Sequence, residues 1–135
     1  MNKITNALMQ YCDNLRAYGN QIETISSLTS YQQWWHTELC QHDLVEEWIT
    51  ESIRISTEKL YGRYVQYCGF HQTAPDEISL WGKHLKKLGI KHTRASQNGR
   101  RISMKVIPNL NQARTLFEKY VNRQFIWPSI EKREN

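Results

Sequence analysis

The chain contains 135 residues, carries a net charge of +5 and has a hydrophobic fraction of 39%. This length fits one domain with a packed core and excludes a multidomain polymerase, helicase or kinase. No run approaches about 18 apolar residues, so we expect no membrane partner. The N-terminus lacks the apolar run of a signal peptide, and the odd, widely spaced cysteines indicate no disulfide framework. We therefore expect a reduced, cytoplasmic protein.

The charges are divided unevenly along the chain. Residues 1–77 carry five basic and ten acidic side chains, whereas residues 78–135 carry thirteen basic and three acidic ones. Between Glu77 and Glu118 the sequence has no carboxylate side chain. A one-sided basic surface is typical of a nucleic-acid binder, because neutralising phosphates releases counterions. The alternatives at this point are a basic face that is merely solvated and an anionic protein partner.

Apolar residues at helical spacing predict two helices near the N-terminus, one over about 3–18 and one over about 30–40. Trp34 and Trp35 lie on the apolar stripe of the second helix. We expect them to dock against other helices. The alternative is an exposed anchor for a partner protein.

Two further helices are expected before residue 70. Asp43 is a suitable N-cap for the first of them, which carries apolar residues as far as Ile53. Ser56 opens the second, which closes near Gly69.

Pro75, Asp76 and Glu77 predict the start of another helix, which ends at Gly89. At about 100° per residue, this helix has an apolar side and a polar side. The apolar side is expected to be buried and consists of Ile78, Trp81, Leu85 and Leu88. The polar side is expected to be exposed and consists of Ser79, Lys83, Lys86 and Lys87.

Beyond this helix the pattern changes to alternation, and Asn98-Gly99 is the strongest short signal for a β-hairpin. A two-residue turn there pairs Gln97 with Arg100 and, further along, His92 with Lys105. This register sorts the side chains into two faces. The apolar face, expected to lie on the core, contains Thr93, Ala95, Ile102, Met104 and Val106. The basic face, expected to meet an anion, contains His92, Arg94, Arg101 and Lys105.

Asn109 is expected to cap a last helix, which has Leu116, Phe117, Tyr120 and Val121 on its inward side. The polar tail after Trp127 and Pro128 is expected to fray.

A basic helix followed directly by a basic hairpin is the layout of a winged helix-turn-helix. We expect a mainly α fold with a small β-hairpin, extra N-terminal helices and a C-terminal helix. In this layout a recognition helix enters the major groove, and the hairpin, or wing, contacts the neighbouring backbone or minor groove. The chain then divides into a helical N-terminal arm (1–41), a winged-helix DNA-binding domain (42–108) and a C-terminal helix with its tail (109–135).

The central segment also carries a motif pattern. Its residues are Leu60-Tyr61-x-x-Tyr64-x-x-Tyr67-Cys68, Pro75, Trp81-Gly82-Lys83-x-Leu85, Leu88-Gly89, Arg94 and Gly99-Arg100-Arg101. They resemble the C-terminal winged-helix domain of phage and plasmid primase–helicases, a family typified by poxvirus and satellite-phage replication proteins. The similarity spans about residues 43–107. Tyr67 replaces the usual Trp and Trp81 the usual Phe.

The resemblance implies binding to DNA, which in some members of the family includes origin DNA. We also expect a replicative helicase or primase, or another protein, as a partner through the N-terminal helices. The sequence has no GxxxxGK[ST] phosphate loop and no polymerising carboxylate cluster, so ATPase and primase activities are not implied. We expect a DNA-reading module that is not an enzyme and needs no cofactor.

Cys40-x-His42 and Cys68-x-x-His71 would together supply a Cys₂His₂ zinc site, but their spacings are not those of a standard zinc knuckle. Cysteines on apolar helix faces are more often core residues than nucleophiles. We therefore expect no metal and no catalytic residue.

The sequence thus predicts a double-stranded DNA-binding protein that acts in replication initiation of a phage, plasmid or other mobile element. The alternatives are a winged-helix transcriptional regulator and a non-enzymatic protein-interaction module that engages a partner through its acidic half. The residues expected to contact DNA are Ser79, Lys83, Lys86, Lys87, His92, Arg94, Asn98, Arg100, Arg101 and Lys105.

Overall fold

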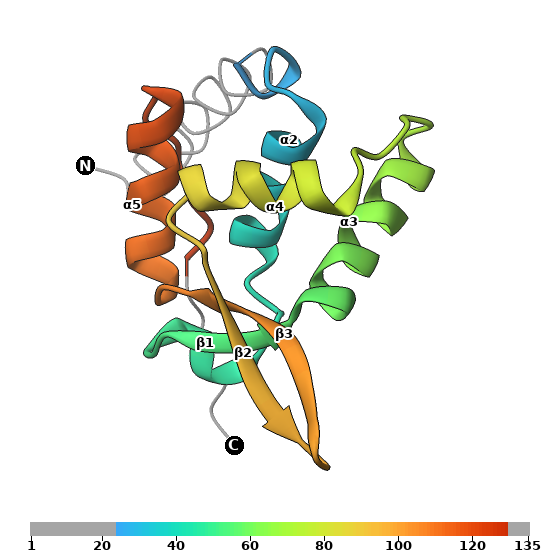
Figure 1. Ribbon diagram of the computed structural model, residues 1–135. Coiled ribbons are helices and arrows are strands. Elements are labelled where there is room, and N and C mark those ends of the chain that lie inside the picture. The colour runs from blue at the N-terminus through green and yellow to red at the C-terminus, as the bar shows by residue number, and fades with distance from the viewer. Residues whose placement is uncertain (1–23, 130–135) are drawn as a thin grey trace, which may run out of the picture.

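The structure is a computed structural model that describes residues 24–129 (Figure 1). Its elements follow the order α2 (Ser30–Gln41), η1 (Glu46–Ile49), β1 (Ile53–Ser56), α3 (Thr57–Phe70), α4 (Ile78–Lys87), β2 (Lys91–Gln97), β3 (Arg100–Ile107) and α5 (Leu110–Val121). The expected mainly α composition with a β-hairpin is confirmed. The helix expected over 3–18 lies outside the described residues.

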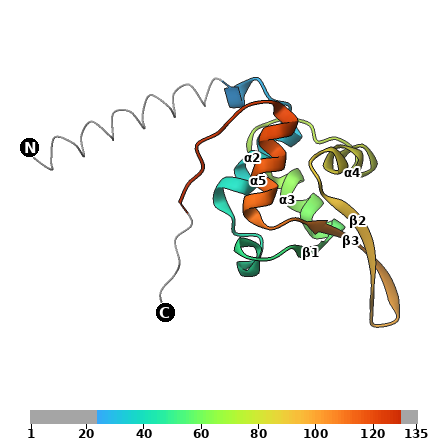
Figure 2. The ribbon, with the colours of Figure 1, turned by 90° about the vertical axis from the view of Figure 1, so that its left-hand side faces the viewer.

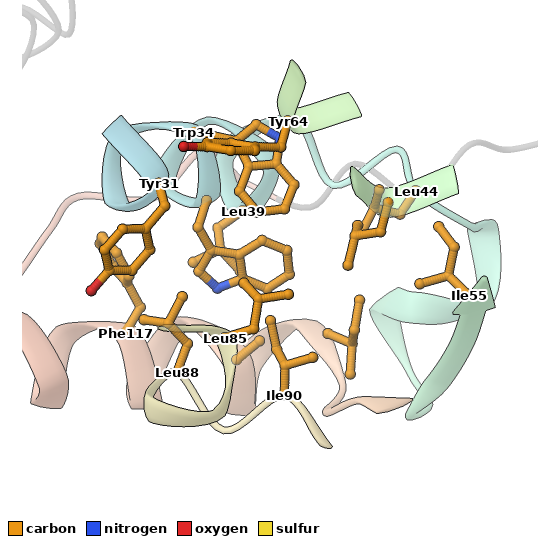
Figure 3. Close-up of a cluster of buried hydrophobic side chains, with 14 of the residues drawn as sticks. Tyr31, Trp34, Leu39, Leu44, Ile55, Tyr64, Leu85, Leu88, Ile90 and Phe117 are labelled. Carbon is orange, nitrogen blue, oxygen red and sulfur yellow. The ribbon is translucent and has the colours of Figure 1, made fainter. Parts of the chain in front are cut away.

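Four tryptophans form the centre of the hydrophobic core. Trp34, Trp35, Trp48 and Trp81 are each at most 1% exposed, and neighbouring indole rings in this group lie 5.5–5.9 Å apart. Figure 3 shows side chains of α2 meeting those of α4 and α5 across this core. Trp34 and Trp35 are therefore docking residues of α2, as expected, and the alternative of an exposed partner anchor is wrong.

Residues on both sides of the expected segment boundaries share this core. Leu39 of α2, Tyr64 of α3 and Phe117 of α5 are fully buried members of one cluster. The guanidinium group of Arg114, on α5, donates hydrogen bonds of 3.1 and 2.8 Å to the carbonyl oxygen of Leu39. Within residues 24–129, the boundaries at 41/42 and 108/109 therefore do not separate independent cores.

The helix expected from Asp43 to Ile53 does not form. This segment instead contains the short 3-10 turn η1 and then β1, in which Ile53 and Ile55 are buried and Arg54 is exposed. The Asp43 carboxylate is not an N-cap, because it accepts a hydrogen bond of 2.9 Å from Arg63 of α3. The alternation of buried and exposed residues in β1 is a strand pattern, and it prevails because β1 pairs with β3.

The start of α3 forms as expected. The hydroxyl oxygen of Ser56 accepts a hydrogen bond of 3.1 Å from the backbone N–H of Lys59, which makes Ser56 the N-cap. Leu60, Tyr64 and Cys68 are buried along one face, and the helix continues to Phe70.

The hairpin forms in the expected register. β2 and β3 are antiparallel, and the predicted pairs from Gln97 with Arg100 to His92 with Lys105 are all present. Asn98 and Gly99 have φ angles of 52° and 75°, as a type I′ turn requires. β1 pairs with the other edge of β3, which gives the sheet order β1-β3-β2.

The apolar face of the hairpin does not cover the core, contrary to expectation. The opposite side of the sheet faces the helices, and there Ile53 and Ile55 of β1 lie beside Ile107 and Lys105 of β3. β1 determines which side of the sheet is buried, because its two buried isoleucines project to the same face as Ile107. The expected core residues are half-buried and lie outside the core cluster; they are Thr93, Ala95, Ile102, Met104 and Val106.

α5 closes the core. Asn109 caps it by accepting a hydrogen bond of 3.0 Å from the backbone N–H of Gln112. Phe117 is fully buried, but Tyr120, expected to point inward, is 38% exposed. The Tyr120 hydroxyl reaches the edge of α2, where it lies 3.1 Å from the hydroxyl of Tyr31.

Candidate nucleic-acid interface

α4 has a buried apolar side and an exposed basic side, as its sequence predicts. The buried residues, each at most 1% exposed, are Trp81, Leu85 and Leu88. The residues expected on the polar side are all exposed: Ser79, Lys83, Lys86 and Lys87.

α3 fixes the position of α4. The hydroxyl group of Tyr61 donates a hydrogen bond of 2.7 Å to the carbonyl oxygen of Asp76, and the Tyr64 hydroxyl accepts one of 3.1 Å from the backbone N–H of Asp76. The Trp81 indole lies against both tyrosine rings, with centroids 5.1 and 6.1 Å away. These contacts set the rotation of α4 and therefore decide which of its side chains face solvent.

Two apolar residues of α4 are also exposed. Ile78, expected in the core, is 47% exposed, whereas the Tyr61 ring packs edge-on against the buried Trp81. Leu80 is 44% exposed. Leu80 lies at helical spacing from Lys83 and Lys87, so helical periodicity places it beside the lysines. The predicted contact residues omit Leu80 because they were selected for polar side chains.

The hairpin exposes most of its predicted contact residues: His92, Arg94, Asn98, Arg100 and Arg101. Lys105 differs, because it is only 6% exposed. Its side chain lies on the helix-facing side of the sheet, beside Ile55 of β1, so Lys105 is buried whereas the other residues of the basic face are exposed.

α4 and the hairpin lie on the same side of the molecule. Figure 2 shows both to the right of the body, with α2 and α5 to the left, and α4 packs next to β2. We call this region the basic side; its exposed residues are Ser79, Lys83, Lys86, Lys87, His92, Arg94, Asn98, Arg100 and Arg101.

The positive charges of the basic side have no carboxylate partner among residues 24–129. The ion pairs of this part of the chain join Arg63 to Glu38 and Asp43, and His84 to Asp76. The mutual proximity of the cations has electrostatic consequences, since burial and then the charge of Lys86 lower the pKa of Lys105. An uncompensated positive surface of this kind attracts polyanions.

The described part of the chain shows no metal centre, since no three His, Cys, Asp or Glu side chains converge there. Cys68 is fully buried, and Cys40 Sγ lies 3.8 Å from the ring nitrogens of His36. Nor does any helix in residues 24–129 have the length and apolar content to cross a membrane.

In comparisons with known proteins, no family model, no curated protein and no solved structure matches this chain.

Proposed function

We propose that this protein binds double-stranded DNA through the basic side, with α4 as the recognition helix and the β2–β3 hairpin as the wing. The observation that carries the proposal is the placement of two basic elements on one side of the molecule with no carboxylate partner within residues 24–129. DNA presents closely spaced phosphates, and lysines and arginines that replace the bound counterions gain affinity by releasing them.

The order of the elements supports a winged helix-turn-helix fold. α3 and α4 are consecutive helices joined by the segment 71–77, the hairpin follows α4 directly, and β1 completes the sheet. In helix-turn-helix proteins the second helix lies in the major groove, and its side chains reach the base edges. Exposed lysines on α4 suit this position, and the arginines of the hairpin suit phosphate contacts beside it.

The proposed role is in replication initiation of a phage, plasmid or other mobile element, with a replicative primase or helicase as partner. This role rests on the motif residues that resemble the primase–helicase winged-helix domain. Three of those residues, Tyr61, Tyr64 and Trp81, are the ones that hold α4 in place. Selection of bound duplexes from a random pool separates this role from transcriptional regulation, because the selected site is sought at a replication origin or at promoters.

The first test is a salt-titrated binding assay with two variants of equal net charge. One replaces Lys83, Lys86 and Arg101 by Gln, all on the basic side. The control replaces Arg54, Lys119 and Arg123 by Gln, which are exposed residues of β1, α5 and the segment after α5. We expect the first variant to lose most of its affinity and about 3 units of the slope of log K against log salt, and the control to lose little. Equal losses, or no duplex binding by the wild type at low salt, would contradict the proposal.

A further inference from the structure

A buried ammonium group lies where α4 meets the hairpin. Lys105 is 6% exposed, and its Nζ lies 3.4 Å from Nδ1 of His92. A Cβ atom placed on Gly82 of α4 would be 3.6 Å from this Nζ, so the ammonium group lies against the backbone of α4. The strand register puts Ile55, Lys105 and His92 in one row across the sheet. Lys105 therefore lies between the side chains of Ile55 and His92.

The groups around this ammonium are cationic or neutral. Lys86 of α4 and Arg94 of β2 contribute positive charge, while the Ser103 hydroxyl lies 3.4 Å from His92 Nδ1 and 2.6 Å from the Thr57 hydroxyl of α3. No carboxylate in residues 24–129 lies within ion-pair distance of Lys105. The ammonium group donates a hydrogen bond to His92 Nδ1, but no negative charge offsets its own charge, so an anion that reaches the junction is stabilised there.

We infer that this junction binds one phosphate group of the DNA backbone, with Lys105, Lys86 and His92 as the charged donors and Ser103 beside them. The inference rests on the proposed function and assigns this contact to the base of the hairpin. A phosphate has the charge and the acceptor oxygens that these donors need, and charge-assisted hydrogen bonds are the strong ones. Because the donors come from both α4 and the hairpin, one bound phosphate fixes both elements on the duplex at the same time.

Binding at this site is linked to protonation of His92. Desolvation, and then the charges of Lys105, Arg94 and Lys86, lower the pKa of His92 in the free protein. A phosphate opposes these three cations and therefore raises the pKa of His92 in the complex. His92 takes up a proton when DNA binds, so affinity increases as the pH falls through the range between the two pKa values.

The test compares two lysine-to-methionine variants of the full chain on one short duplex. Lys105→Met removes the buried charge and keeps an apolar stem, so the fold is expected to remain at least as stable, which a thermal melt checks. Lys91→Met removes the same charge from an exposed residue of β2 whose partner is Val106, on the opposite side of the sheet. We expect Lys105→Met to bind about tenfold more weakly and to lose about 1 unit of the log K–log salt slope. Lys91→Met keeps the wild-type slope.

The second measurement is an NMR pH titration of the His92 ring, free, with duplex and with inorganic phosphate. We expect duplex to raise the pKa of His92 in the wild type and not in Lys105→Met. If the wild type binds duplex but Lys105→Met keeps the wild-type affinity and slope, the phosphate site is overturned and DNA binding stands. If the wild type binds no duplex, the proposed function fails. In that case, a rise in the pKa of His92 with inorganic phosphate that requires Lys105 supports the anion site alone. If inorganic phosphate leaves the pKa of His92 unchanged, the anion site is overturned as well.

Discussion

The indole Nε1 of Trp48 donates a hydrogen bond of 2.8 Å to the carbonyl oxygen of Pro108, sixty residues further along the chain. This bond ties η1 to the end of β3, where the chain enters α5. Trp81 is equally buried, but its Nε1 has no hydrogen-bond partner in the structure. The two indoles therefore differ in one polar contact while both fill the core.

This difference predicts unequal effects of the same substitution on stability. Trp48→Phe leaves the Pro108 carbonyl without its donor, whereas Trp81→Phe removes an unpaired N–H. We expect Trp48→Phe to lower the free energy of unfolding by about 1 kcal/mol more than Trp81→Phe. Trp81→Ala empties the space between α3 and α4 and is expected to cost about 3–5 kcal/mol. Urea denaturation of the three variants measures these values, and a Trp81→Ala protein as stable as the wild type would refute the placement of α4.

The wing makes a prediction about salt dependence. Arg101 is exposed on β3 and has no carboxylate partner within residues 24–129. If it meets a phosphate, Arg101→Ala weakens binding to all duplexes alike and lowers the log K–log salt slope by about 1. The matched control is Arg123→Ala, beyond the end of α5. An unchanged slope for Arg101→Ala would remove the wing from the interface.

Lys83 tests whether α4 reads bases or only holds phosphates. A lysine that reaches the O6 and N7 atoms of guanine discriminates between base pairs by about 1–3 kcal/mol. We expect Lys83→Ala to lose affinity selectively for the best selected duplex and to relax the preference at one or two positions. The comparison uses selected and scrambled duplexes at one salt concentration. An equal loss on both would make the protein a non-specific DNA clamp and would rule out origin recognition by Lys83.

Leu80 makes a prediction of a different chemical kind. An exposed leucine beside the lysines of α4 is suited to contact the C5-methyl group of thymine in the major groove. At one selected position, replacing thymine by uracil is then expected to weaken the binding free energy of the wild type by about 1 kcal/mol, which is close to the contribution of one buried methyl or methylene group. Leu80→Ala is expected to bind the two duplexes equally. A thymine preference that persists in Leu80→Ala would assign the contact to another residue.

His36 predicts a pH dependence of stability that is independent of DNA. It is 6% exposed among the rings of Phe117, Phe125 and Trp127, and burial lowers its pKa from 6.5 to about 4. Between these two values the unfolded chain binds more protons at this site than the folded protein. The contribution to the free energy of unfolding is therefore complete above about pH 6.5 and decreases by about 3 kcal/mol as the pH falls to about 4.

The measurement is urea denaturation of the wild type and of His36→Leu across this pH range. The variant has no titrating group at position 36, so its stability is expected to decrease less between pH 6.5 and pH 4. If stability depended on pH equally in the two proteins, His36 would take up its proton at the same pH in the folded and unfolded states, and the lowered pKa would be wrong.

Local chemistry made several elements predictable from the sequence. Asn98-Gly99 favours one turn type, and that turn determines which residues of β2 and β3 pair, so the register was correct in every predicted pair. Ser56 caps α3 with its own side chain, and Gly89 supplies the positive φ of 84° just after α4. The exposure of Lys83 and its neighbours also followed from helical periodicity alone.

The errors occur where contacts between distant segments decide the structure. The apolar residues around Ile53 predict a helix, but pairing with Ile107 makes Ile53 part of a strand. Ile78 lies on the apolar side of α4 by periodicity and is exposed, while Tyr61 of α3 packs against the buried Trp81. Each outcome depends on a partner far along the chain, which periodicity within one segment does not report.

The sequence by itself determined the hairpin, its register, the basic side of α4 and the excess of positive charge after residue 77. The tertiary structure alone decided which side of the sheet is buried, and with it the environment of Lys105. A hairpin has two faces, and either can be covered; pairing of β3 with β1 placed Ile53 and Ile55 on the side of Lys105 and Ile107. Lys105, which the alternating pattern places on the face expected to meet an anion, thus lies against the backbone of α4, because burying those isoleucines required its side of the sheet to face the helices.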